Sequence, residues 1–224
     1  MYKQISLSTD LAELKDQFQL KHVLFNYQPQ ASVEPNQNGS VIVSDGDERS
    51  LVQYTWGIFP HWAKDAINAR SETIHEKEAY RKMFVRNRCV IPCDSFFAAK
   101  AEKKKTRTIR FALREQRIFG LAGLYDVWRN PRGSEFRTFT LLTTRANRLI
   151  SDYHESMPVI LDDYSLDKWL DPTIHNKEVL ASLLHSFDPQ LMTAELLPYQ
   201  DPRRKKQLAE PAEDLQLQYA LIKK

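Results

Sequence analysis

The stretch WRNPRGSEFRTFTLLTTRANRLISDYHESMPVIL, residues 128–161, decides the fold that we expect. Its segment 136–144 is rich in Phe, Thr and Leu, as β-strands are, and it ends in the hydroxyl side chains of Thr143 and Thr144. His154 follows, with a carboxylate neighbour and then an apolar segment. Because histidine titrates near neutral pH, His154 is a candidate proton-transfer group beside a polar pocket floor. The alternative is a structural histidine held by hydrogen bonds.

Composition indicates one globular domain. The 224 residues are 42% hydrophobic and 27% charged, an ordinary balance for a chain that buries a single core. The sequence has no run of about 18 apolar residues and no apolar signal core at its start, so we expect a cytoplasmic protein without a membrane partner. We expect the domain over residues 1–198, and a charged tail over residues 199–224 that packs on it or trails from it.

Positive charge gathers in three runs, although the net charge is only +3. The runs lie at residues 81–88, 100–110 and 203–206. If folding brings them to one face, they would bind a phosphate backbone with an affinity that falls as salt rises. The alternative is that they are solvated loop charges.

The two cysteines, Cys89 and Cys93, do not have the spacing of a redox pair, and two thiols alone do not make a zinc site. On an extended segment positions 89, 91 and 93 share one face, so we expect both thiols in the core. We expect no metal and no cofactor.

Periodicity predicts an α+β fold with many short strands. Residues 41–43 and 51–58 indicate a hairpin, and residues 89–92, 106–113, 118–127 and 136–144 indicate further strands. Helices are predicted at 11–18, capped by Asp10 with Glu13 as its capping-box partner, at 73–87 capped by Thr73, at 165–170 and at 176–187. We therefore expect a mostly antiparallel, barrel-like sheet with peripheral helices.

Two segments between these elements carry candidate nucleic-acid contacts. Trp56 and Trp62 surround a Gly and a Pro, and exposed indoles in such a loop can stack on bases, whereas buried indoles are the alternative. Asn68, Arg70 and Glu72 alternate, so an extended backbone places them on one side. The carboxamide and guanidinium can bind a phosphate or a base edge, or Arg70 can pair with Glu72.

Several motifs together resemble the SOS-response-associated peptidase (SRAP) family over roughly residues 1–170. In order, they are WGIFPHWAKD (56–65), NARSET (68–73), RCVIP (88–92), AGLY (122–125), TFTLLTT (138–144) and HESMPVIL (154–161). Each motif alone is weak, but their order and spacing together are specific.

The resemblance implies a single β-rich domain with a positively charged cleft for single-stranded DNA. Family members use a cysteine after the initiator Met, whose α-amine and thiolate close a thiazolidine ring on the aldehyde of an abasic site. A glutamate and a histidine move protons, and an asparagine orients the site. On this sequence the histidine corresponds to His154, the asparagine to Asn68 and a DNA-binding arginine to Arg70.

The resemblance fails at two catalytic positions. Tyr2 stands at the position of the cysteine, has no thiol, and is too bulky to permit removal of Met1. Ala98 stands at the position of the glutamate and cannot transfer a proton. The covalent step is therefore expected to be absent in a chain that keeps the fold.

Three functions remain open. The first is non-covalent binding of single-stranded or abasic DNA through Arg70, Asn68, Trp56, Trp62, Thr143 and Thr144. The second is a residual lyase or peptidase that uses His154, although nothing in the sequence places Ser95 or Ser156 beside it. The third is a protein-interaction module that regulates an active paralogue. A pocket closed by Tyr2 would favour this module, and an open basic cleft would favour DNA.

Overall fold

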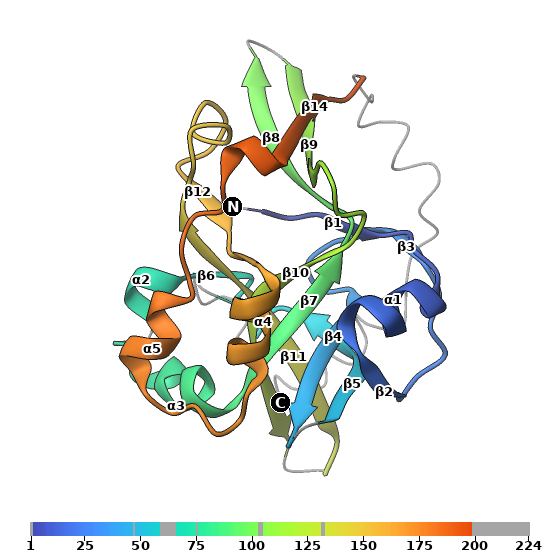
Figure 1. Ribbon diagram of the computed structural model, residues 1–224, viewed down its shortest axis with the longest axis vertical. Coiled ribbons are helices and arrows are strands. Elements are labelled where there is room, and N and C mark those ends of the chain that lie inside the picture. Colours follow the sequence, from blue (N-terminus) through green and yellow to red (C-terminus); the bar gives the residue numbers. More distant parts are fainter. Residues whose placement is uncertain are drawn as a thin grey trace, which may run out of the picture.

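The computed structural model describes residues 2–46, 48–58, 66–74, 76–102, 105–130 and 133–198, and more of these lie in β-strands than in helices (Figure 1). The strands are β1 Ile5–Leu7, β2 Leu20–Val23, β3 Gln30–Val33, β4 Asn38–Asp45, β5 Glu48–Trp56, β6 Asn68–Arg70, β7 Arg88–Cys93, β8 Ser95–Glu102, β9 Lys105–Leu113, β10 Phe119–Arg129, β11 Glu135–Arg145, β12 Ser156–Pro158, β13 Ile160–Leu161 and β14 Met192–Leu196. The helices are α1 Leu11–Phe18, α2 Ser71–Ile74, α3 Glu78–Arg86, α4 Asp163–Leu170, α5 Lys177–Ser182 and the short 3-10 helix η1 Pro189–Leu191.

Part of the larger sheet closes into a barrel. β11 pairs with β10, β10 with β7, β7 with β4 and β4 with β5, and β5 returns to β11. The closing pair is parallel and short, with Thr55 opposite Thr138 and Trp56 opposite Phe139. The other steps of this ring are antiparallel. The expected α+β fold with a mostly antiparallel, barrel-like sheet and peripheral helices is thus confirmed.

A second sheet carries the start of the chain to the barrel. Its order is β14-β9-β8-β1-β3, and its neighbouring strands are antiparallel. In Figure 1 the β8–β9 hairpin rises above the barrel, and β1 runs from the N-terminus across the base of this hairpin, where Ile5 pairs with Phe96. Residue 2 therefore reaches the region between the two sheets.

Side chains along the barrel strands point alternately into two hydrophobic cores. On β7, Cys89, Ile91 and Cys93 face the core shared with the second sheet, while Val90 faces the core under the helices. Every residue of β7 is buried, because both of its faces are covered. The expectation that both thiols pack in the core is confirmed, and burial raises the pKa of both.

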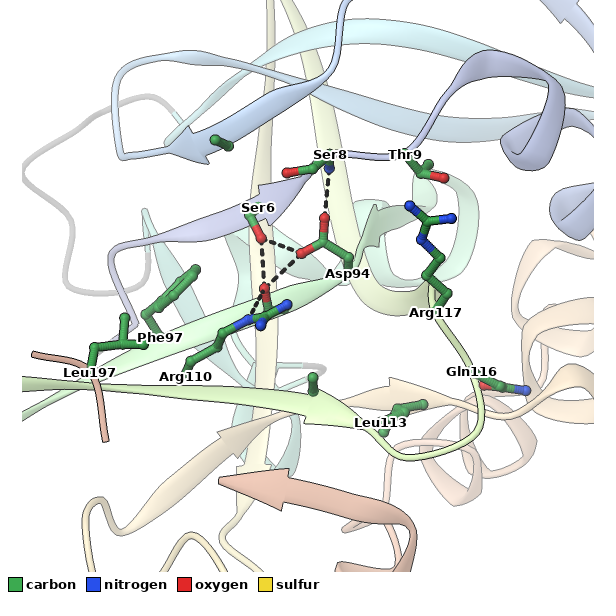
Figure 2. A pocket seen from close by; sticks show the side chains of 13 residues that line it. Ser6, Ser8, Thr9, Asp94, Phe97, Arg110, Leu113, Gln116, Arg117 and Leu197 are labelled. Carbon is green, nitrogen blue, oxygen red and sulfur yellow. Dashed lines mark hydrogen bonds between the residues drawn. The ribbon is translucent and has the colours of Figure 1, made fainter. Parts of the chain in front are cut away.

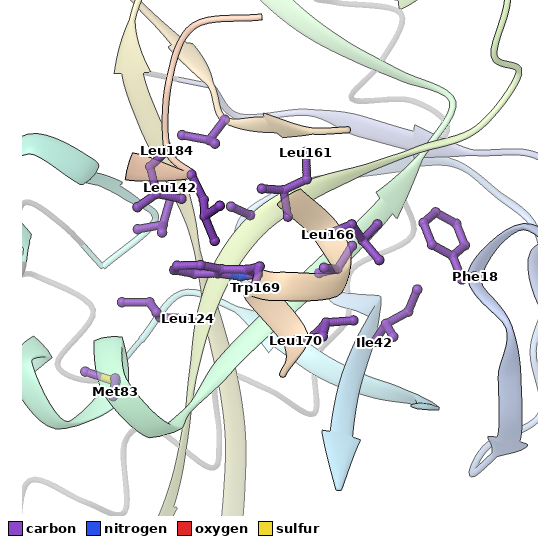
Figure 3. Packing of buried hydrophobic residues seen from close by; sticks show 14 of the residues in the cluster. Phe18, Ile42, Met83, Leu124, Leu142, Leu161, Leu166, Trp169, Leu170 and Leu184 are labelled. Carbon is purple, nitrogen blue, oxygen red and sulfur yellow. The ribbon is translucent and has the colours of Figure 1, made fainter. Parts of the chain in front are cut away.

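Trp169 on α4 lies at the centre of the core under the helices (Figure 3). Figure 3 shows its ring among side chains of the barrel strands, such as Leu124 and Leu142. The indole is fully buried, and its N–H donates to the Cys89 backbone oxygen at 2.9 Å. The bond satisfies the ring's only polar atom, so the indole can be buried without an unmet donor.

The first helix begins as predicted, although its capping contacts differ in one respect. Asp10 accepts from the Glu13 backbone N–H at 2.9 Å. The Glu13 carboxylate, however, bonds to the Thr9 hydroxyl. The predicted helix 165–170 is confirmed as α4, which starts slightly earlier under a cap from Asp162.

Two predicted helices differ from the structure. The stretch 73–87 is interrupted, with Thr73 inside the short α2, and a new helix, α3, begins after Lys77, whose side chain forms no capping hydrogen bond. The predicted helix 176–187 ends early, at Ser182, after a cap from Asn176. The strand β8 was not predicted at all. Among the residues that the structure describes, none of the helices has both the length and the apolar character needed to cross a membrane.

Candidate functional site

Tyr2 occupies the space beside His154 and is completely buried. Its ring lies 5.1 Å from the His154 ring and meets Phe96 of β8 edge to face at 5.5 Å. The phenol donates to the Ser156 backbone oxygen at 2.7 Å. Burial raises the pKa of Tyr2, so the phenol stays protonated and keeps this hydrogen bond at neutral pH.

Asn68 holds the backbone of Tyr2 from the other side. Its Oδ1 accepts from the Tyr2 N–H at 3.0 Å, and its Nδ2 donates to the Tyr2 carbonyl at 2.8 Å. Asn68 begins β6, which pairs in parallel with β11, so the barrel sets its position. The structure thus brings together Tyr2, Asn68 and His154, three of the residues that the sequence singled out.

Ser156 contacts the His154 ring through its backbone N–H and its hydroxyl. The Ser156 N–H donates to His154 Nδ1 at 3.1 Å, and the Ser156 hydroxyl lies 3.1 Å from the same nitrogen. A ring nitrogen that accepts from an N–H carries no proton, so this arrangement suits the neutral imidazole. Burial lowers the pKa of His154 and favours the same form. When the ring is protonated, Nδ1 can donate to the Ser156 backbone oxygen, which lies 3.0 Å away.

Ser156 is a site residue that the sequence did not place. Nothing in the sequence placed Ser156 beside His154, because the contact depends on the turn into β12, where Ser156 pairs with Arg145. The signal available was only the hydroxyl type of the residue. Its hydroxyl and N–H both contact the same imidazole nitrogen, as expected for a group that fixes the ring.

Ala98 lies on β8 on the same face as Phe96, the face that packs on Tyr2. Its exposed fraction is 5%. A methyl group therefore stands where the resemblance predicts a carboxylate, and position 98 has no side-chain proton to transfer. Both departures seen in the sequence, at Tyr2 and at Ala98, belong to one contiguous region of the fold.

Arg70 lies at the exposed edge of this region, at the end of β6. Its side chain is 60% exposed, and its Nε lies 3.9 Å from a Glu72 oxygen. Such a loose, exposed ion pair contributes little stability, so it leaves the guanidinium available to a stronger partner. Arg145 and Lys3 are also exposed, and Arg145 is the register partner of Ser156.

Thr143 and Thr144 are buried, and their hydroxyls form hydrogen bonds within the fold. The Thr143 hydroxyl donates to the Ala69 backbone oxygen at 3.3 Å, and the Thr144 hydroxyl donates to the Glu72 carboxylate at 3.3 Å. They are 3% and 6% exposed. They position β6 and α2 and present no surface to a strand of DNA, so the prediction that they contact DNA directly does not fit their burial.

Trp56 is also unavailable for stacking on a base. Its ring is fully buried, stacks on Phe139 at 6.0 Å and donates its N–H to the Ile67 backbone oxygen at 2.8 Å. Both faces of the indole are therefore covered, and of the two alternatives for this ring the buried one holds. Trp62 lies outside the described residues.

The basic runs are only partly on the surface. Arg81, Lys82 and Arg86 are exposed, but Arg88 is buried and donates to backbone oxygens of Val85, Trp169 and Asp171. Side chains 100–106 and the run 203–206 lie outside the described residues. Among the described residues, no group of three or more His, Cys, Asp or Glu side chains is arranged to hold a metal ion.

Comparisons with known proteins agree with the fold. A family model described as SOS response associated peptidase (SRAP) matches residues 1–198. Abasic site processing protein YoqW of Bacillus subtilis is 38% identical over 203 residues, which are 87% of this chain and 91% of that protein. Abasic site processing protein HMCES of Xenopus tropicalis is 30% identical over 182 residues, which are 65% of this chain and 54% of that protein.

Solved structures are similar over the same extent. A crystal structure of a protein from Bacteroides thetaiotaomicron has a TM-score of 0.75 and 28% identity, and the match covers 87% of this chain and 91% of that one. A protein from Bordetella bronchiseptica has a TM-score of 0.75 at 24% identity, covering 88% of this chain and 99% of that one, which supports the fold alone.

Proposed function

Because the chain belongs to the SOS response associated peptidase (SRAP) family, we propose that it binds single-stranded or abasic DNA without forming a covalent link. The observation that carries the absence of a covalent link is the buried phenol of Tyr2 beside His154 and Asn68, and the exposed guanidinium of Arg70 supports DNA binding at the edge of this region. The relatives' names refer to abasic-site processing. In this chain the residue at position 2 fills the site instead of presenting a thiol.

The chemistry of the site supports the absence of a crosslink. A thiazolidine needs an amine and a thiol on one residue, and Tyr2 supplies a phenol that is already bonded to the Ser156 oxygen. Its raised pKa also makes the phenol a poor nucleophile. Ala98 adds no proton-transfer group. His154 and Asn68 then act as structural partners of Tyr2.

DNA would contact the rim of this site and not its interior. Arg70, Arg145 and Lys3 are exposed around it, and phosphate can replace Glu72 as the partner of Arg70. Contacts of this kind do not depend on base sequence and weaken as salt rises. We therefore place Arg70, Arg145 and Lys3 in the proposed DNA-binding set, keep Asn68 as a partner of the Tyr2 backbone, and leave out Trp56, Thr143 and Thr144.

A gel experiment tests the proposal. The full chain is incubated with labelled single-stranded DNA that carries one abasic site, and samples are run on native and denaturing gels. We expect a native shift that weakens with salt and disappears on denaturation. R70Q is expected to weaken the shift, and R114Q, which removes an exposed arginine on the loop after β9, serves as the matched control. A band that survives denaturation would overturn the proposal.

A protein-interaction module is the second candidate, and the closed pocket is the observation in its favour. The Tyr2 side chain is fully buried and fills the space beside His154, so an abasic sugar has no room there while this side chain is in place. Pull-down from extract with and without nuclease separates the two candidates. A partner retained after nuclease, with no native shift on DNA, would support the module.

A residual enzyme has one observation in its favour, the contact of the Ser156 hydroxyl with His154 Nδ1. Strand scission of abasic DNA, or peptide hydrolysis, that both S156A and H154A abolish would establish it. Under the DNA-binding proposal, neither reaction occurs above background.

A further inference from the structure

A groove lies on the outer face of the second sheet, opposite the face that packs on Tyr2 (Figure 2). Phe96 of β8 and Phe111 of β9 face inward, so Ser95 and Arg110, their neighbours along the strands, face outward. The groove has a volume of about 630 Å³. That volume lies within the range of about 300–1,000 Å³ that is usual for small-molecule sites.

A hydrogen-bonded cluster forms the floor of this groove. One carboxylate oxygen of Asp94 accepts from the hydroxyls of Ser6 and Ser95, and the other accepts from the Ser8 N–H at 2.6 Å. The Ser6 and Ser95 hydroxyl oxygens lie 2.7 Å apart. The Asp94 charge is therefore met by three donors from the protein itself, and it repels an incoming anion less than an unpaired carboxylate would.

This cluster positions the guanidinium of Arg110. Its Nε–H donates to the Ser95 hydroxyl at 3.1 Å, as Figure 2 shows, and Ser95 is only 1% exposed. The far end of the guanidinium has a weaker partner, Glu195 on β14, with Nη1 and Oε2 3.7 Å apart. The Arg110 and Glu195 side chains are 42% and 63% exposed, so this ion pair is screened by water. An anion with better geometry can displace Glu195.

The groove also has an apolar part and a second cation. Phe97 and Leu197 line it, both half-buried. Figure 2 shows these two side chains on one side of Arg110, and Arg117 on the other. Arg117 is 75% exposed and lies 3.4 Å from a Glu13 oxygen. An apolar surface beside a positioned guanidinium suits a ligand that joins an aromatic ring to a phosphate.

We propose that this groove binds a nucleotide, with Arg110 holding the phosphate while Phe97 and Leu197 contact the base. The site lies across the sheet from Tyr2 and does not depend on the function proposed for that region. The nucleotide can be a free mononucleotide or part of a strand, since both present the same phosphate and base. The Arg110 guanidinium is the group that both forms would require.

Calorimetric titration of the full chain tests the site with dAMP, deoxyadenosine and inorganic phosphate. We expect dAMP to bind more tightly than either of the other two, because only dAMP engages both parts of the groove. R110Q is expected to weaken dAMP binding by at least about tenfold through loss of charge-assisted hydrogen bonds. E195Q is expected to tighten it by roughly two- to fivefold, because it removes a competing carboxylate. R114Q is the matched control and should bind as the unmodified protein does.

The opposite effects of R110Q and E195Q distinguish a specific site from a general loss of charge or of fold. Absence of dAMP binding, unchanged binding in R110Q, weaker binding in E195Q, or equal binding of inorganic phosphate would overturn the proposal.

A tetranucleotide of deoxyadenosine identifies the source. If the tetranucleotide binds more tightly than dAMP, and if its binding is lost in R110Q but kept in R70Q, the groove is assigned to a strand. If the tetranucleotide and dAMP bind with equal affinity, the groove is assigned to the mononucleotide. Tetranucleotide binding that is lost only in R70Q belongs to the rim near Tyr2, and if dAMP binding follows the same pattern the groove proposal is overturned.

Discussion

The side-chain amide of Asn68 forms two hydrogen bonds with the backbone of Tyr2. Oδ1 accepts from the Tyr2 N–H at 3.0 Å, and Nδ2 donates to the Tyr2 carbonyl at 2.8 Å. Both bonds use backbone groups that almost every amino acid has, so they hold position 2 whatever its side chain. The chemistry at this position therefore depends on the side chain alone, which can be exchanged.

The double variant Y2C/A98E is expected to gain a covalent link to abasic DNA. The cysteine that replaces Tyr2 permits removal of Met1 and supplies both an amine and a thiol. The carboxylate introduced at position 98 is expected to add about 100-fold to the rate by proton transfer. Y2C alone should therefore react slowly. A band on a denaturing gel that requires the abasic site is the measurement.

Y2S/A98E is the matched control for this gain. Serine also permits removal of Met1, but it has no thiol, so no thiazolidine can form. Replacing a buried Tyr by a small residue is expected to cost about 3–5 kcal/mol by analogy with other buried aromatic side chains, and both variants carry this cost. A folded Y2C/A98E that forms no crosslink would contradict the idea that only these two side chains are missing.

The Tyr2 phenol is expected to contribute a measurable hydrogen bond. Y2F removes the donor to the Ser156 oxygen, which lies 2.7 Å away, and keeps the ring contacts with Phe96 and His154. A buried hydrogen bond of this kind contributes about 0.5–1.5 kcal/mol to the free energy of unfolding. Urea denaturation measures the loss. Y164F changes a tyrosine that is 69% exposed and should have no effect.

The strands β7 and β11 were readable from the sequence, because residues 89–91 are apolar and residues 136–144 are rich in Phe, Thr and Leu. The prediction that positions 89, 91 and 93 share a face is confirmed, since all three belong to the same core. The strand β8 was missed, and its residues 98–102, Ala-Ala-Lys-Ala-Glu, have low β propensity. Pairing with β9 and β1 imposes the strand there.

The surroundings of Tyr2 depend on the same strand and were therefore not predictable. Sequence comparison with the family could show that the thiol and the carboxylate are replaced. It could not show that the phenol fits against Phe96, or that the turn before β12 brings Ser156 onto His154. The break in the helix predicted at 73–87 has a similar origin, because Thr144 and Glu72 tie α2 to the barrel. Contacts between distant segments override the local pattern in each case.

Stability is expected to fall as the pH is lowered through the ordinary pKa of histidine, and His154 is one cause. Burial lowers the pKa of His154 below its usual value of 6.5, so between these two pKa values the unfolded chain binds more protons than the folded one. The free energy of unfolding therefore rises with pH across that interval. In H154Q the difference in stability between about pH 5.5 and 7.5 should be smaller. H175Q, at an exposed histidine, should keep the full difference.

Arg88 is expected to be the most costly arginine to replace, because its guanidinium ties two helices to the barrel. Nε donates to the Trp169 oxygen at 2.7 Å and Nη2 to the Asp171 oxygen at 2.5 Å, both at the end of α4, while Nη1 donates to Val85 on α3. R88M leaves these carbonyl groups without their donor in a region where Arg88 is only 6% exposed. We expect a loss of roughly 3–5 kcal/mol in the free energy of unfolding.

R88K provides a graded test of the same contacts. It keeps the charge but cannot reach all three oxygens from one ammonium group, so its loss of stability should lie between those of the unmodified protein and R88M. R86Q, at an exposed arginine in the last turn of α3, should change stability by less than about 0.5 kcal/mol. Urea denaturation of the three variants measures these differences. If R88M were as stable as R86Q, the hydrogen bonds of Arg88 would not hold the helices, and packing around Trp169 alone would account for their position.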